Sequence, residues 1–123
     1  MANKVTNIGY EIEEKVANLL KKDGNKILAR NYKSKYGEID IVYREKASKT
    51  IVFVEVKYRK NSDYGKPYEF VNKKKFERIM KTVHIFLMEN KLSHNIAMRF
   101  DVISVLSNGE IKHFKSVNDY DLY

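Results

Sequence analysis

The sequence contains no cysteine, which excludes disulfide bonds and thiolate metal sites. It has no apolar stretch that approaches the length of a membrane span, and its first residues, MANKVTNIGYEIEEK, lack the apolar core of a signal peptide. We therefore expect a cytoplasmic protein without a membrane partner. Only one proline occurs, and 43% of the residues are hydrophobic and 33% charged, as is typical of a folded globular chain. The length predicts a single domain over residues 1–123.

Acidic residues are few relative to basic ones. The 24 Lys and Arg residues against 16 Asp and Glu give a formal net charge of +8. Such an excess favours a polyanionic partner, because each phosphate that a cation neutralises releases condensed counterions. Nucleic acid, and DNA in particular, is the partner that we expect. A surface adapted for solubility explains the charge equally well, so charge alone does not decide between the two.

Apolar periodicity and turn signals predict two helices and five strands. The helices are expected over about residues 5–22 and around Phe76 to Leu87, and the strands at residues 26–32, 38–43, 50–58, 97–106 and 111–114. The segment 59–72 holds the proline and has no clear period, so we expect a loop there. The order α-β-β-β-α-β-β predicts an α/β fold, a mixed β-sheet flanked by helices, whose first three strands form an antiparallel meander.

The strand IVFVEVKYR carries charge where a core strand is usually apolar throughout. Strand side chains alternate between faces, so Glu55 and Lys57 point to the same side. If the hairpin that precedes them is centred at residues 47–48, Asp40 faces Glu55 and Glu38 faces Lys57. Directly opposed side chains have Cβ atoms roughly 5 Å apart. Acids from two neighbouring strands are therefore expected to meet.

Two carboxylates at this separation repel each other and call for a cation between them. Hard oxygen ligands suit Mg²⁺ or Mn²⁺, which take one or two carboxylates, several waters and a substrate phosphate. A metal held in this way polarises a phosphodiester and activates a water molecule. Lys57, on the same strand face as Glu55, can orient that water or stabilise the charge on the phosphate. The pattern thus predicts metal-dependent phosphodiester chemistry.

A simpler alternative is that Glu38 and Lys57 form a cross-strand ion pair, while Asp40 and Glu55 lie at a solvated sheet edge. For any single charged residue this is the usual explanation. Two acids and a lysine that converge beside a strongly apolar run favour metal chemistry, because buried charges are rare unless they are paired or functional.

The segments GEID and FVEVKYR together resemble the bipartite signature of the PD-(D/E)XK nuclease superfamily, in which an Asp on one strand and Glu-x-Lys on the next bind metal. More closely, ILARNYKSKYGEIDIV, FVEVKYR and RFDVI resemble the YraN family of small bacterial proteins, considered relatives of Holliday-junction resolvases. The likeness covers about Gly9 to Ser104 and implies a restriction endonuclease-like core. It implies that Asp40 and Glu55 bind the metal and that Lys57 is the catalytic lysine.

The resemblance also implies an acid in the first helix. The family usually shows Gly-x-x-Gly-Glu there, and the match is Gly9 to Glu13, with Ile12 in place of the second glycine. Glu13 borders the apolar stripe of the predicted helix, whereas Glu11 and Glu14 are expected to point into solvent. We therefore add Glu13 to the expected catalytic residues.

Basic residues near the second helix are the predicted nucleic-acid contacts. Lys74 and Arg78 lie opposite the apolar stripe of that helix, and Lys75 matches a lysine that the family usually carries after the loop. Arg59 lies where the loop begins, among tyrosines that could stack on unpaired bases. A solvated outer helix face explains the helix cations about as well.

The function that we predict is a metal-dependent endonuclease that hydrolyses phosphodiester bonds in DNA, with branched or structured DNA as a candidate substrate. The alternative is a non-catalytic nucleic-acid-binding module that keeps the nuclease fold, and a third hypothesis is a protein-interaction domain. The acids favour the enzyme, since a pure binder gains nothing from carboxylates that face phosphates. A resolvase-like role favours a homodimer, because two symmetric cuts need two sites.

Overall fold

The computed structural model describes residues 4–60, 71–118 and 122, and its elements follow the predicted order. They are α1 (Lys4–Lys22), β1 (Lys26–Lys33), β2 (Glu38–Arg44), β3 (Ile51–Arg59), α2 (Lys73–Glu89), β4 (Met98–Leu106) and β5 (Ile111–Phe114). The α/β class is confirmed. Most of the loop predicted at residues 59–72 lies outside the described residues.

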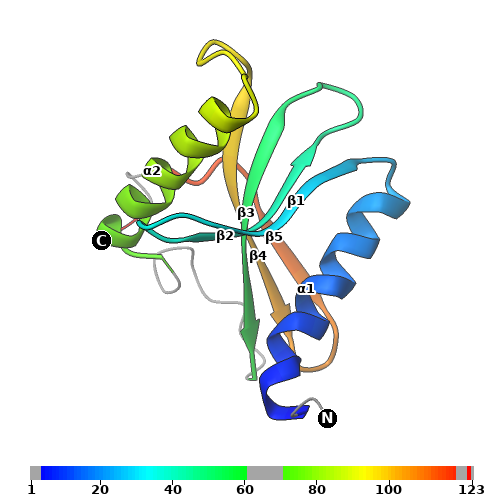
Figure 1. Ribbon diagram of the computed structural model, residues 1–123. Coiled ribbons are helices and arrows are strands. Elements are labelled where there is room, and N and C mark those ends of the chain that lie inside the picture. Colours follow the sequence, from blue (N-terminus) through cyan, green and yellow to red (C-terminus); the bar gives the residue numbers. More distant parts are fainter. Residues whose placement is uncertain (1–3, 61–70, 119–121, 123) are drawn as a thin grey trace.

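A single sheet of five strands in the order β1-β2-β3-β4-β5 forms the centre of the structure (Figure 1). The first three strands are antiparallel, which confirms the predicted meander. Strands β3 and β4 are parallel and β5 returns antiparallel to β4, so the sheet is mixed. Helix α2 lies in the crossover that parallel pairing of β3 with β4 requires.

Each helix covers one face of the sheet, and each face has its own apolar core. Helix α1 contributes Val16, Ala17 and Leu20 to one core, and α2 contributes a buried stripe to the other, namely Ile79, Val83, Phe86 and Leu87. Side chains of β3 enter both cores in turn, which explains its uninterrupted apolar run. Burial of each large apolar side chain contributes roughly 1.5–3 kcal/mol.

The sheet forks between β2 and β3. The β2–β3 ladder has the predicted register and ends at the pair Ile41 and Val54. Beyond this pair, β2 extends back to Glu38 while still pairing with β1, and β3 extends on to Arg59 while still pairing with β4. The diverging segments from Glu38 and from Glu55 form what we call the fork. Glu38 and Lys57 are therefore not partners in the ladder, contrary to the predicted pairing.

Strand β1 is irregular at two points, and the second of them, Asn31, lies beside the fork. Its pairing with β2 shifts between Ile27 and Ala29, and Asn31 has a left-handed backbone with φ 50°. Asn31 lies between paired neighbours that place it opposite Asp40. Asparagine tolerates this conformation better than most residues, and such strain in a strand interior is often found near functional sites.

Candidate active site at the fork

Asp40 joins the two sides of the fork. Its Oδ2 accepts a hydrogen bond from the backbone N–H of Val56 at 2.8 Å. The carboxylate thus replaces a main-chain acceptor just beyond the end of the ladder, where buried backbone donors need partners. This bond fixes Asp40 against β3 and next to Glu55.

Glu55 is buried, with 5% of its surface exposed, and is surrounded by charged groups. Its Oε2 lies 2.5 Å from Nζ of Lys75 and 3.5 Å from Nζ of Lys57. The negative charge of Glu55 also acts on the carboxyl of Asp40, so the two acids lie close together. The structure therefore brings Asp40, Glu55 and Lys57 together as the sequence pattern suggested, and adds Lys75 from α2.

The Asp40 carboxyl is held in its protonated form around neutral pH. Burial, followed by the negative charge of Glu55, raises the pKa of Asp40 to about 8, while the Val56 N–H opposes the shift. A divalent cation between the two carboxylates would neutralise the same repulsion that the proton relieves. The pair is thus a site that a proton or a hard cation can satisfy.

Lys75 comes from the first turn of α2. Its backbone N–H donates to Oδ1 of the helix cap Asn72 at 2.8 Å, which fixes where the lysine leaves the helix. Burial disfavours its ammonium, but the hydrogen bond and charge of Glu55 outweigh burial and raise the pKa of Lys75. Lys75, which the sequence suggested as a nucleic-acid contact, thus already pairs with an acid of the fork.

Glu13 approaches the fork from α1. Burial and then the charge of Glu38 raise its pKa, with Glu55 adding to the shift, whereas Arg30 and a hydrogen bond from Asn31 lower it. These influences place Glu13 near the acids of the fork and beside the left-handed Asn31. The sequence analysis did not single out Asn31, although an Asn in the interior of a strand is a local signal of irregular backbone.

Glu14 points away from the buried stripe of α1 as expected, with 40% of its side chain exposed, and its ion-pair partner lies on β1. Its Oε2 lies 3.1 Å from Nη1 of Arg30 on β1, and the same guanidinium lies over the ring of Tyr10, 5.2 Å from its centroid. The two contacts hold the middle of α1 against β1. They orient the preceding residue, Glu13, toward the fork.

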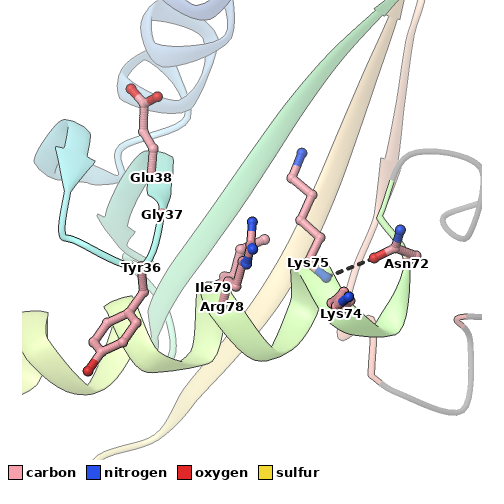
Figure 2. A pocket seen from close by; sticks show the side chains of 8 residues that line it. All are labelled: Tyr36, Gly37, Glu38, Asn72, Lys74, Lys75, Arg78 and Ile79. Atoms are coloured by element: carbon pink, nitrogen blue, oxygen red, sulfur yellow. Dashed lines mark hydrogen bonds between the residues drawn. The ribbon is translucent and has the colours of Figure 1, made fainter.

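A cavity of about 320 Å³ lies between the turn that precedes β2 and the first turns of α2 (Figure 2). Its lining residues are Tyr36, Gly37, Glu38, Asn72, Lys74, Lys75, Arg78 and Ile79. Lys75 belongs to both this cavity and the ion pair with Glu55. Figure 2 shows the ring of Tyr36 and the side chain of Glu38 pointing in opposite directions.

The predicted nucleic-acid contacts fall in two places. Lys74 and Arg78 are exposed and line the cavity. Arg59 is partly buried at the end of β3, where it is paired with Leu106 of β4. Lys74, Lys75 and Arg78 thus form one group, and Arg59 lies further along the strand that carries Glu55.

The donor set at the fork suits a hard cation. Within residues 4–60, 71–118 and 122, no three His, Cys, Asp or Glu side chains are grouped so as to hold a metal by themselves. Two carboxylates are enough for Mg²⁺ or Mn²⁺, which complete their shells with water and substrate phosphate. Asp40 and Glu55 are the residues that would hold such an ion. The ion would have to compete with the ammonium of Lys75 for the carboxylate of Glu55.

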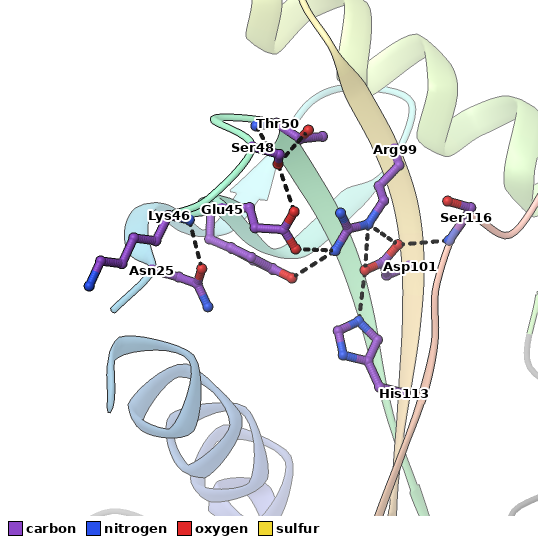
Figure 3. Close-up of polar contacts among 10 residues, drawn as sticks. Asn25, Glu45, Lys46, Ser48, Thr50, Arg99, Asp101, His113 and Ser116 are labelled. Carbon is purple, nitrogen blue, oxygen red and sulfur yellow. Dashed lines mark hydrogen bonds and ion pairs between the residues drawn. The ribbon is translucent and has the colours of Figure 1, made fainter. Parts of the chain in front are cut away.

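A second polar cluster lies on the α1 face of the sheet and is of a different kind (Figure 3). Arg99 donates from Nε to both carboxylate oxygens of Asp101 at 3.0 and 3.1 Å. Asp101 also contacts Nε2 of His113 at 2.7 Å and accepts from the backbone N–H of Ser116 at 3.0 Å. Asp101 is fully buried and both of its carboxylate oxygens have hydrogen-bond partners, so we infer that this cluster stabilises the fold.

The fold and site together define a mixed α/β domain with an acid–lysine cluster at a fork in its sheet. None of its described helices is long and apolar enough to cross a membrane. The chain belongs to the family described as Uncharacterised protein family UPF0102, whose model matches residues 12–105. The YraN-like resemblance is thereby confirmed, while membership of the nuclease superfamily stays a prediction.

Relatives from several bacteria are similar to this chain over most of their length. A UPF0102 protein of Lachnoclostridium phytofermentans is 44% identical over 115 residues, which cover 94% of this chain and 93% of the relative. One from Vibrio vulnificus is 43% identical over 103 residues, or 83% of each chain. A third, from Fusobacterium nucleatum, is 39% identical over 110 residues, or 89% of each.

Proposed function

We propose that this protein is a metal-dependent endonuclease that cleaves phosphodiester bonds in DNA, with branched or structured DNA as its substrate. The observation that carries the proposal is the meeting of Asp40 and Glu55 at the fork, with Lys57 3.5 Å from Glu55. Buried carboxylates that are forced together are more typical of a functional site than of a stabilising one.

Each residue has a distinct part in this proposal. Asp40 and Glu55 would hold Mg²⁺ or Mn²⁺, which would supply Lewis-acid activation of a phosphate oxygen and of a water molecule. Hydrolysis forms a bond between the water oxygen and phosphorus and breaks one ester bond, whose oxygen leaves with a proton. Lys57, whose side chain is 36% exposed, donates hydrogen bonds to the charge that gathers on the phosphate. Glu13 contributes a further carboxylate from α1.

Cleavage of a panel of linear, flapped and four-way-junction DNA with Mg²⁺ or Mn²⁺ tests the proposal. Asp40→Ala and Lys57→Ala should each lower the cleavage rate by about 100-fold or more while DNA binding persists. Glu77→Gln, which changes an exposed acid of α2 away from the fork, is the matched control and should cleave normally. Unchanged cleavage by Asp40→Ala would show that the fork is not the active site.

One observation favours a second candidate, the non-catalytic nucleic-acid-binding module. Lys75 lies 2.5 Å from Glu55 and so supplies, from within the chain, the positive charge that a metal would provide. In such a module the acids and lysines would only hold α2 against the sheet. DNA would then bind the basic surface with an affinity that depends on salt but not on Mg²⁺.

Metal titration of Lys75→Gln separates the two candidates. If the fork is a metal site, wild type binds Mn²⁺ in a calorimeter and Lys75→Gln binds it several-fold more tightly, because the competing ammonium is gone. Asp40→Asn is the control that should lose the binding. If neither wild type nor Lys75→Gln takes up Mn²⁺ and no DNA is cut, the binding module is supported instead.

A further inference from the structure

The cavity between the turn at residues 34–37 and α2 is lined in part by positive charges that have no acidic partner among the described residues. Within the described ranges, the side chains of Lys74 and Arg78 have no ion pair or hydrogen bond, and Glu38 is the only acid that lines the cavity. Helix α2 begins with three lysines, Lys73 to Lys75, and has no acid in its first turn to offset them. The cavity therefore favours an anionic occupant.

The walls of the cavity are fixed by hydrogen bonds. Oγ of Ser34 lies 2.8 Å from Oγ1 of Thr82 and also accepts from the backbone N–H of Tyr36 at 3.0 Å, which attaches the turn to α2. The N–H of Ser34 donates to the carbonyl of Gly37 at 2.8 Å and closes the turn. Because these bonds set the separation of turn and helix, the cavity cannot widen without breaking them.

The size and lining of the cavity match one nucleotide. Its volume of about 320 Å³ is at the small end of the range for ligand sites and is too small for a base pair. Lys74 and Lys75 can receive a phosphate, and the planar guanidinium of Arg78 can stack on a base. Ile79, which is 2% exposed, supplies an apolar floor.

The cavity is next to the fork, because Lys75 lines one and pairs with Glu55 in the other. A strand whose phosphate lies at the fork can therefore place its neighbouring nucleotide in the cavity. We propose that this cavity binds a single unpaired nucleotide of a DNA strand, next to the phosphate at the fork. The inference rests on the proposed function and narrows its substrate to DNA with an unpaired nucleotide beside the cleaved bond, since unpaired bases enter pockets at least cost.

Gly37 offers a direct test, because it lines the cavity without a left-handed backbone. A Cβ built there would lie 3.9 Å from Cβ of Arg78 and Oγ1 of Thr82, which is ordinary contact. Gly37→Leu should thus fill the cavity, whereas Gly37→Ala should leave most of it open. Binding is measured by fluorescence anisotropy, with Ca²⁺ in place of Mg²⁺ to prevent cutting, on a duplex and on the same duplex with a single-stranded flap.

Wild type and Gly37→Ala should bind the flapped DNA about tenfold more tightly than the duplex, and Gly37→Leu should bind both alike. Arg78→Gln should lose the same preference, which keeps the test valid if Gly37→Leu fails to fold. Lys73→Gln is the charge-matched control for Arg78→Gln, because Lys73 lines a different groove of α2. This substitution should weaken the binding of both DNAs equally. Equal binding of the two DNAs by wild type, or a preference that survives both cavity variants, would overturn the inference.

The result is separable from that of the proposed function. If the flap preference depends on the cavity but no DNA is cut, the inference stands and the endonuclease proposal fails. If DNA is cut at the fork while wild type shows no preference for the flap, the endonuclease proposal stands and this inference fails.

Discussion

Protonation of Asp40 links the acids of the fork to the stability of the protein. Asp40 is fixed by the N–H of Val56 and cannot move away from Glu55 without losing that bond. Electrostatic repulsion between the two carboxylates therefore destabilises the folded state unless a proton or a cation reduces it. A side-chain pair of this kind is unfavourable for folding by itself, which is the residue-scale reason to regard the fork as functional.

The stability of the metal-free protein should fall as pH rises. The folded-state pKa of Asp40, about 8, is above the ordinary value of 3.8, so the folded chain binds this proton more tightly than the unfolded chain does. The contribution of Asp40 is thus complete below about pH 4 and is lost as pH rises toward about 8. In EDTA we expect Tm to fall by about 10 °C between pH 5 and pH 8. Asp40→Asn keeps an acceptor for Val56 and should flatten this slope.

Differential scanning calorimetry of the two proteins provides the measurement. Addition of Mg²⁺ should raise the Tm of wild type most at the high end of the range and leave Asp40→Asn unchanged. Identical slopes for wild type and Asp40→Asn would show that the Asp40 proton is not coupled to folding.

At the scale of elements, the start of α2 has an unfavourable charge for a helix N-terminus. Lys73, Lys74 and Lys75 occupy its first turn without an acid among them, although the helix dipole favours negative charge there. The side chain of Asn72 accepts from the N–H of Lys75 and compensates in part for this arrangement. The cap thus holds in place the helix turn that supplies both the fork and the cavity.

Asn72→Ala should lower the free energy of unfolding by about 1 kcal/mol, because the N–H of Lys75 loses its acceptor. Asn72→Asp keeps an acceptor and adds a negative charge to the first turn, so it should be at least as stable as wild type. Urea denaturation followed by circular dichroism measures both. An Asn72→Ala variant as stable as wild type would mean that the cap does not stabilise α2.

At the scale of the whole molecule, the polar cluster around Asp101 joins the end of β2, strand β4, strand β5 and the chain that follows β5. Arg99 bridges Asp101 to Glu45 after β2, at 3.0 Å, and His113 and Ser116 attach β5 and the chain beyond it. Burial by itself would raise the pKa of Asp101, but hydrogen bonds from His113 and Arg99 outweigh it and hold that pKa below 3.8. The cluster therefore stabilises the fold at neutral pH and loses that effect only as pH falls through the lowered pKa.

Asp101→Ala should lower the free energy of unfolding by about 3 kcal/mol or more, because it leaves Arg99 and His113 without their shared buried partner. Chemical denaturation gives this value. In the folded fraction, Mn²⁺ binding at the fork should match that of wild type, since Asp101 contributes nothing to that site. Loss of Mn²⁺ binding in a variant that remains folded would contradict the separation of the two clusters.

The sequence by itself determined the element order, the class of fold, the β2–β3 register and the meeting of Asp40 with Glu55. These features follow from local periodicity and from a short hairpin, in which neighbouring residues dictate the geometry. The bond from Lys75 to Glu55, the left-handed Asn31 beside Glu13 and the link from Glu14 to Arg30 were decided only by tertiary structure. Such contacts depend on how each helix packs on the sheet, and no local pattern encodes where a long charged side chain ends once burial has removed its solvent.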